Sequence, residues 1–418
     1  MLYFDSYQQL REALQSDDAV IPFDDLHIHR QEFRSTSYKL LPGEEDYCCE
    51  QHQEHFNLQH SFYTNIGHIS NQIQIRDNDI RENQVFSYHI FMPASVKKAE
   101  SAIFLLHGFN EKNWDKYLPW AQYLARHTGS AVILFPIAFH MNRTLSIWSD
   151  KRNMFRLSEE RKKMFPDVVD SSLTNVAISM RLHSRPQRFI WSGLQTYYDI
   201  IRFVESCKDG LNSLISPTAR FHFMSYSIGC LLAEILKLTN HNNYFSESRL
   251  CLFCGGAVFN RLSPVSKYIL DSEANIALYA YMIEHMKKHM DHDRQLKHYI
   301  NGPHPEGLVF YSMLDYKEKL AYRESLFNQV SRKLMAITLK QDTIIPPYEI
   351  INTLQGATRD IPIPVTVYDF PFRYNHVNPF PATDKNKELI DEKFKLVFGQ
   401  FAAFINGEKT QLIRDKTT

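Results

Sequence analysis

The sequence FHFMSYSIGCLLAEIL, residues 221–236, joins a short apolar run to an apolar-periodic stretch through a tight turn. The run predicts a buried strand, and the periodic stretch predicts a helix. Ser227 stands in the turn with the small residues Ser225 and Gly229 two positions before and after it, as a sharp strand-to-helix turn requires. A hydroxyl placed there projects above the sheet at a helix N-terminus, where free N–H groups favour an anion. This pattern indicates a nucleophile.

Short apolar runs recur on both sides of this turn, as is typical of strands buried on both faces of a parallel sheet. They are SAIFLLHG (101–108), AVILFP (131–136), FHFMS (221–225), LCLF (250–253), LMAITL (334–339) and PVTVYDF (364–370). Amphipathic stretches lie at 112–127, 189–206, 228–238, 347–354 and 385–405. The alternation predicts a doubly wound, mostly parallel α/β sheet with helices on both faces.

The chain ahead of this pattern is polar, dotted with aromatic residues and irregular, with histidines at 52, 55 and 60. We expect residues 1–72 to form an N-terminal extension packed on a core domain of residues 73–418. Two intervals, at about 140–187 and 258–330, are too long for simple crossovers. Such insertions at the carboxyl edge of a sheet usually form lids, so we expect a cap there.

A nucleophilic serine needs a base and an acid that orients the base. Asp342 follows the strand LMAITL, and His376 follows the strand PVTVYDF, so both are expected at the sheet edge where ligands bind. The structural alternatives are a helix cap for Ser227 or Asp342 and a packed side chain for His376. The rival nucleophile is Ser225 and the rival acid is Asp369; both are more consistent with structural roles.

The chain from about residue 84 to 405 resembles the α/β-hydrolase fold family and is close to the uncharacterised bacterial members of that family. The resemblance is carried by His107-Gly108-Phe109-Asn110, Ser225-Tyr226-Ser227-Ile228-Gly229, Asp342 followed by Ile344-Ile345-Pro346, and His376. Ser225 departs from the family pattern, which commonly has glycine there.

The resemblance implies an eight-stranded α/β-hydrolase sheet with an antiparallel second strand, for which the stretch 73–93 is available as a first hairpin. It also implies that the backbone N–H groups of Phe109 and Ile228 form an oxyanion hole. The expected activity is hydrolysis of an ester, or less readily an amide or thioester, by a Ser227–His376–Asp342 triad with no cofactor and no metal. The alternatives are acyl transfer on the same triad and a non-catalytic binding protein that has kept the fold.

The charge composition restricts which classes of molecule the chain is expected to bind. Lys and Arg number 47 and Asp and Glu number 47, so the chain lacks the basic excess of a nucleic-acid-binding protein. The N-terminus lacks a secretory pattern and no apolar run is long enough to span a membrane, so a cytoplasmic location is expected. We expect a small-molecule acyl substrate; the oligomeric state stays open. Aromatic residues and methionines in the cap insertions fit an apolar acyl group or ordinary cap packing: Phe155, Met164, Phe165, Tyr279, Tyr281, Met282 and Met286.

Other residues with metal or redox chemistry are expected to be structural. Cys251 and Cys254 have CxxC spacing, but they lie in a predicted buried strand with no second pair nearby. The histidines at 285, 289 and 292 fit the solvated face of a cap helix, and His27 and His29 lack the remaining pattern of a metal-dependent barrel.

Overall fold

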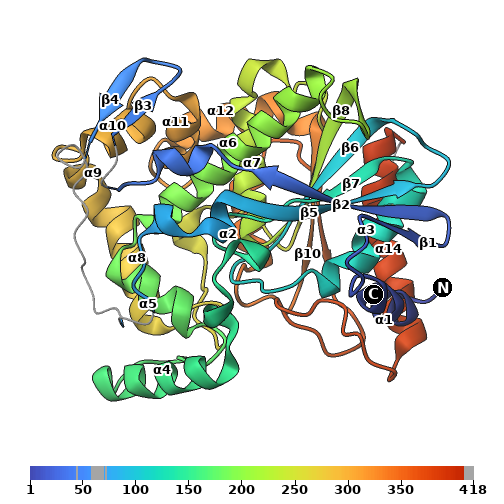
Figure 1. Cartoon of the computed structure of the whole chain (residues 1–418), viewed down its shortest axis with the longest axis horizontal. Coiled ribbons are helices and arrows are strands. Elements are labelled where there is room, and N and C mark those ends of the chain that lie inside the picture. The colour runs from blue at the N-terminus through green and yellow to red at the C-terminus, as the bar shows by residue number, and fades with distance from the viewer. Residues whose placement is uncertain (44–45, 58–69, 71–72, 409–418) are drawn as a thin grey trace.

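The computed structural model describes residues 1–43, 46–57, 70 and 73–408. Figure 1 shows helices on both faces of a large twisted sheet, with α4, α5, α8 and α9 gathered to one side of it. Within the described residues, no helix is long and apolar enough to cross a membrane.

The strands are β1 (Val20–Phe23), β2 (Leu26–Arg34), β3 (Tyr47–Cys49), β4 (Glu54–Phe56), β5 (Val85–Pro93), β6 (Ala99–Leu106), β7 (Ala131–Leu134), β8 (Ile215–Tyr226), β9 (Leu250–Phe253), β10 (Leu334–Leu339) and β11 (Val365–Tyr368). The helices are α1 (Tyr3–Ala13), α2 (Arg81–Gln84), α3 (Leu118–Thr128), α4 (Lys151–Met164), α5 (Val176–Ser184), α6 (Arg188–Lys208), α7 (Ile228–Thr239), α8 (Ser272–Ala280), α9 (Met286–His289), α10 (Arg294–Asn301), α11 (Pro305–Ser312), α12 (Leu320–Val330), α13 (Pro347–Leu354) and α14 (Lys387–Asn406).

The main sheet has the order β1-β2-β5-β7-β6-β8-β9-β10-β11. In this order, β7, β6, β8, β9, β10 and β11 run parallel to one another. The remaining strands β1, β2 and β5 pair antiparallel with their neighbours. The carboxyl ends of the parallel strands therefore share one edge, which places the turns after β6, β8, β10 and β11 together. The mixed α/β fold class with a large, mainly parallel sheet, expected from the sequence, is confirmed.

Alternate residues of each central strand enter different cores. On β6, Ile103 and Leu105 pack with α1, α3 and α14, whereas Phe104 and Leu106 pack with α6 and α7. This separation follows from the two-residue period of a strand, and burial of both sets explains why the central strands appear in the sequence as continuous apolar runs. The doubly wound arrangement thus rests on two separate cores.

The strand number differs from the expected eight because β1 and β2 come from the N-terminal segment. They form a hairpin closed by Asp24 and Asp25, with Asp24 at φ 51°, and β2 pairs with β5 along its whole length. Of the stretch expected as a first hairpin, residues 85–93 form a strand; residues 73–84 include the short helix α2 instead. Strand β2 was not recognised in the sequence because it buries Leu26 and Ile28 but carries polar residues along most of its length. The domain boundary at residue 72 stays a prediction.

The two predicted insertions fold mainly as helices, α4 and α5 in the first and α8 to α12 in the second. A buried ion pair joins them: Arg161 of α4 donates to Asp271, the residue that caps the N-terminus of α8, at 2.5 and 2.8 Å. Helices α5 and α8 also pack against each other. The insertions therefore form one helical layer from distant parts of the chain.

A second buried pair lies beneath this layer. Arg143 donates to Asp199 of α6 at 2.8 Å, and both side chains are fully buried. Arg143 also donates to Asn83, while Asp199 accepts a hydrogen bond from Ser35 at 2.6 Å. The pair thus links α6 to the N-terminal strands.

We expect Asp199→Asn to lower the free energy of unfolding by about 3–5 kcal/mol, because it leaves the Arg143 charge buried without its counter-charge. Glu159→Gln, which removes an exposed pair with Lys162, should cost no more than about 1 kcal/mol. Chemical denaturation of both variants tests this, and equal losses would contradict the structural role given to the Arg143–Asp199 pair.

Candidate active site

The turn at Ser227 has an unusual backbone conformation. Ser227 adopts φ 56° and ψ −127° between the last residue of β8 and the first of α7. Its N–H donates to the carbonyl of Phe253 on the adjacent strand β9 at 3.1 Å. Neighbouring backbone thus holds a non-glycine residue in a disfavoured region, as is common at functional turns.

Two glycines make this turn possible. A Cβ at Gly229 would lie 2.7 Å from the carbonyl oxygens of both Leu106 and His107, and a Cβ at Gly255 would lie 2.5 Å from the carbonyl oxygen of Ser227. Ser225, where the family commonly has glycine, is accommodated, because its hydroxyl donates to the carbonyl of Cys251 at 3.2 Å. The tight constraint therefore falls at Gly229 and Gly255.

The structure brings Ser227, His376 and Asp342 together in one hydrogen-bonded chain. The Oγ of Ser227 lies 2.7 Å from Nε2 of His376, and Nδ1 of His376 lies 2.7 Å from Oδ2 of Asp342. All three side chains are buried, with exposed fractions of 4–5%. A carboxylate on Nδ1 favours the tautomer whose Nε2 can accept the serine proton.

Neighbouring groups hold the acid and the base in place. The second carboxylate oxygen of Asp342 accepts from the N–H groups of Ile344 and Ile345 at 2.9 and 3.0 Å. The ring of Tyr226 stacks on that of His376, with centroids 5.5 Å apart and an interplanar angle of 20°. Both partners of Ser227 are therefore oriented by residues other than the serine.

The loop His107-Gly108-Phe109-Asn110 passes directly against the serine. A Cβ at Gly108 would lie 3.3 Å from the Cβ of Ser227. His107 accepts from the N–H of Ile137 through Nε2 at 2.9 Å and therefore donates through Nδ1 to the carbonyl of Gly108 at 2.7 Å. Burial lowers the pKa of His107 well below its ordinary value, which keeps the ring neutral for this role. The loop backbone is thereby fixed.

Phe109 and Ile228 lie on the two turns that meet at Ser227. Phe109 follows Gly108, and Ile228 is the first residue of α7, where an N–H has no acceptor within the helix. Their part in an oxyanion hole stays a prediction, and their position beside the serine fits that role.

Asn110 ties the loop to both helical insertions. Its Nδ2 donates to the carbonyl of Thr174 at 3.1 Å and to that of Tyr268 at 2.7 Å.

Thr174, Tyr268 and Ile269 line a pocket together with Ser227 and His376. The pocket lining also includes polar and charged residues that follow the loop, among them Glu111, Lys112, Asn113 and Lys116. Burial lowers the pKa of Lys112 to about 8.

A second cavity begins at Phe109 and Ile228 and extends between α6, α7 and α11. Its lining is mainly apolar and includes Phe189, Leu194, Leu231, Leu232, Ile235 and Phe310. The cap aromatic residues and methionines were compatible with either an apolar acyl group or ordinary cap packing, and none of them, Phe165 included, lines this cavity. Phe155, Met164 and Tyr279 are exposed, while Tyr281, Met282 and Met286 are buried in the core. The apolar surface beside the serine comes instead from α6 and α7, which flank the sheet, and from α11 of the second insertion.

The other residues with possible catalytic, redox or pocket roles lie apart from the Ser227 site or have contacts of their own. Asp369 accepts from Gln341 and from Tyr374, each at 2.9 Å, and it is half exposed. Cys251 and Cys254 are buried free thiols, and burial raises the pKa of each. Arg143, which borders the first insertion, is engaged by Asp199 and does not reach the pocket.

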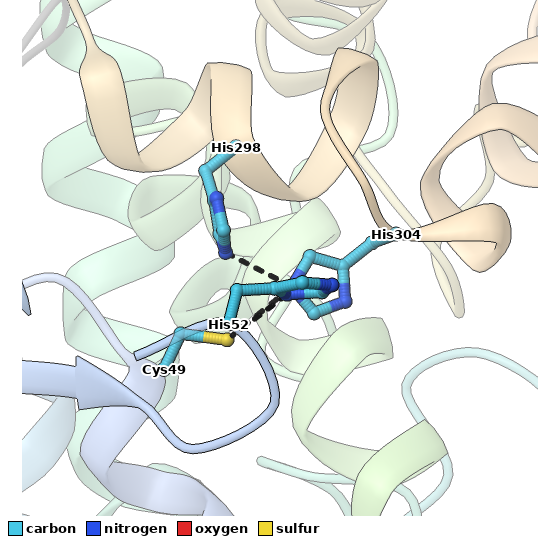
Figure 2. A group of neighbouring side chains, drawn as sticks. All are labelled: Cys49, His52, His298 and His304. Carbon is cyan, nitrogen blue, oxygen red and sulfur yellow. Dashed lines mark hydrogen bonds between the residues drawn. The ribbon is translucent and has the colours of Figure 1, made fainter. Parts of the chain in front are cut away.

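One cluster of possible ligands was missed in the sequence. Cys49, His52, His298 and His304 offer a sulfur and three ring nitrogens within 4.8 Å of one another (Figure 2). The Cys-x-x-His spacing at 49–52 was the available local signal, but the other half of the cluster is about 250 residues away. Within the described residues, the cap histidines at 285, 289 and 292 belong to no such group.

Comparisons with known proteins give a family without an assigned activity. A family model described as "Family of unknown function (DUF6051)" matches residues 1–406. No curated protein matches. Among solved structures, the chain is similar to an esterase from Pyrobaculum calidifontis, with 12% identity, a TM-score of 0.42 and coverage of 97% of this chain and 90% of that one. It is also similar to an S-formylglutathione hydrolase from Agrobacterium tumefaciens, with 11% identity, a TM-score of 0.43 and coverage of 91% and 97%.

We expect Gly229→Ala to lower the free energy of unfolding by about 1–3 kcal/mol, because the new methyl group overlaps two backbone oxygens that cannot move freely. Gly399→Ala in α14 is the matched control: its Cβ would come no closer than 3.4 Å to Tyr123, and alanine favours a helix by up to about 1 kcal/mol. Denaturant melts of the two variants should shift in opposite directions. Unchanged stability of Gly229→Ala would contradict the tight turn.

Proposed function

The chain belongs to the DUF6051 family, and we propose that it is a serine hydrolase that cleaves an ester through an acyl-serine intermediate. The observation that carries this proposal is the buried chain of two 2.7 Å hydrogen bonds from Ser227 through His376 to Asp342, set on a strained strand-to-helix turn. A merely structural serine needs neither the turn nor the two partners.

In the proposed reaction, Ser227 Oγ attacks the carbonyl carbon of the substrate as Nε2 of His376 takes the hydroxyl proton. The C–O bond to the leaving group then breaks, and His376 returns the proton to the departing oxygen. Water, deprotonated by the same nitrogen, releases the acyl group from Ser227. Asp342 holds the imidazole orientation and stabilises the imidazolium at each stage.

The negative charge of the tetrahedral intermediate would be received by the N–H groups of Phe109 and Ile228. Two features support this assignment: the loop backbone at Gly108 lies against Ser227, and α7 begins at Ile228 with its positive dipole end toward the site. Donors fixed in advance for a developing oxyanion usually supply the largest single contribution to catalysis of this kind.

The two cavities suggest how a substrate lies. The apolar cavity that starts at Phe109 and Ile228 suits an apolar acyl chain. The pocket with Lys112, Lys116 and Asn113 suits a polar leaving alcohol. We assign the two helical insertions as the cap over this site, because Thr174 of one and Tyr268 of the other accept hydrogen bonds from Asn110 and line the serine pocket.

We expect Ser227→Ala to lower kcat/KM for ester hydrolysis by about 10³-fold or more, because it removes the nucleophile. Its melting temperature should hardly move, since the turn is held by backbone contacts rather than by the hydroxyl. If Ser227 only capped α7, the change would cost about 1 kcal/mol of stability and leave turnover intact. Steady-state kinetics and thermal melts separate the two roles.

Two further variants test the partners. Asp342→Asn keeps the shape of the acid but disfavours the required tautomer of His376, so a loss of about 10⁴-fold is expected. Ser225→Gly restores the commoner residue at a position that contacts Cys251 rather than the substrate, and activity should stay within about tenfold. A larger loss in Ser225→Gly than in Asp342→Asn would contradict the assignment.

The acyl cavity is tested at Gly193 of α6, which lines it and has no atom within 4 Å of its ideal Cβ. Gly193→Leu should fill the cavity and abolish the preference for longer acyl esters, each lost methylene contact being worth about fourfold in kcat/KM. Gly193→Ala should give a smaller effect of the same sign. An unchanged chain-length profile for a p-nitrophenyl ester series would place the acyl group elsewhere.

A further inference from the structure

A cluster of one cysteine and three histidines lies outside the candidate active site, between the β3–β4 hairpin and helices α10 and α11 of the second insertion. Cys49 ends β3, His52 lies in the turn before β4, His298 lies on α10, and His304 precedes α11 (Figure 2). Three of the four side chains are buried, and His52 is exposed to solvent. We propose that these four residues bind a zinc ion that fastens the β3–β4 hairpin to α10 and α11.

The distances fit tetrahedral coordination. The sulfur of Cys49 lies 3.6 Å from Nδ1 of His52 and 3.4 Å from Nε2 of His304, and the Nε2 atoms of His298 and His304 lie 3.0 Å apart. With Zn–S bonds of about 2.3 Å and Zn–N bonds of about 2.0–2.1 Å, the edges of a tetrahedron measure about 3.3–3.6 Å. The three distances lie close to those values, and all four ligand atoms lie within 4.8 Å of one another.

The carboxylates that contact His298 and His304 also support a metal site. Nδ1 of His298 faces a carboxylate oxygen of Glu54 at 3.0 Å, and Nδ1 of His304 faces one of Glu306 at 2.9 Å. In these contacts each Nδ1–H donates to a carboxylate oxygen, which leaves both Nε2 atoms facing each other. Carboxylates in this position are the usual second layer of a metal site, because they fix the ring and increase its basicity.

A proton alone satisfies this cluster poorly. One shared proton can bridge the two Nε2 atoms, but the single thiol proton of Cys49 can serve only one of its two ring neighbours, Nδ1 of His52 at 3.6 Å or Nε2 of His304 at 3.4 Å. A single cation meets all four groups.

The donor set selects the metal class and its role. Sulfur and imidazole ligands favour zinc over the oxygen-seeking Ca²⁺ and Mg²⁺. Four protein ligands leave no open position for water or substrate, which indicates a structural site rather than a Lewis acid. The exposed ring of His52 gives an entry path from solvent.

A structural role fits the elements that the cluster joins. The β3–β4 hairpin has strands of three residues each and is not part of the main sheet. Such a short two-stranded hairpin is marginal in water without further support. On the other side, Ile300, Glu306, Gly307 and Phe310 of α10 and α11 line the apolar cavity. If the proposed esterase function holds, the metal therefore also positions the far end of the acyl cavity.

The primary test is the metal content of the purified full chain after incubation with zinc and removal of free metal. We expect about one zinc per wild-type chain and a loss of at least tenfold in Cys49→Ser and in His52→Ala, the latter a change in an exposed turn that should not prevent folding. Cys48→Ser and His55→Ala are matched controls on the same hairpin and should retain zinc. Zinc absent from the wild type, or equally present in all four variants, would overturn the proposal.

Alkylation of Cys49 gives a second readout that does not depend on the behaviour of variants. Iodoacetamide followed by peptide mapping should label Cys49 at least tenfold more slowly in zinc-loaded protein than after chelation, while Cys48 labels equally in both. Equal labelling of Cys49 would overturn the site. Retention of a different metal after exchange against zinc would overturn the choice of zinc.

The same measurements on Ser227→Ala keep this inference separate from the proposed activity. That variant should bind zinc like the wild type, because Ser227 is not a ligand. Loss of zinc binding in Ser227→Ala would overturn a site confined to the four residues. Esterase activity with no zinc would overturn the metal site alone, and zinc with no activity would overturn the esterase alone.

Discussion

The backbone of Ser227 is the constraint on which the rest of the site depends. A serine at φ 56° must be held there by its surroundings, and the holding contacts are backbone ones: its N–H on the carbonyl of Phe253, and the close passage of Gly229 and Gly255. These contacts join β6, β8 and β9 at one edge of the sheet. Because β10 and β11 end at the same edge, the loops that follow them bring Asp342 and His376 into reach. The hydrogen-bonded arrangement of Ser227, His376 and Asp342 is thus a consequence of the strand order.

The surroundings of this turn divide into an apolar side and a polar side. The apolar cavity passes between α6 and α7, which flank the sheet, and α11 of the second insertion, whereas the polar pocket is closed by residues of both insertions. Asn110 links the two insertions to the loop that lies against Ser227. The two insertions and the loop against Ser227 are therefore joined through one side chain.

How much of this the sequence could predict depends on the range of the contacts. The nucleophile turn is encoded in sixteen consecutive residues, and Asp342 and His376 follow recognisable apolar strands, so the structure brings these three together as the sequence suggested. The strand β2 could not be recognised, because an outer strand with polar residues along most of its length lacks a continuous apolar run. The Cys49–His304 cluster was missed for a different reason: its two halves are far apart in sequence, and only packing of the hairpin on α10 unites them. The apolar cavity likewise arises from helix packing that no local pattern specifies.

The central claim is that Ser227 is an activated nucleophile, and a fluorophosphonate probe tests it most directly, because such probes react with a serine whose base and oxyanion donors are in place. Incubation of the full chain with the probe, followed by peptide mapping, should place the label on Ser227, and prior treatment with an ester substrate should slow labelling. No label on Ser227 in folded protein, or label on Ser225 instead, would contradict the account.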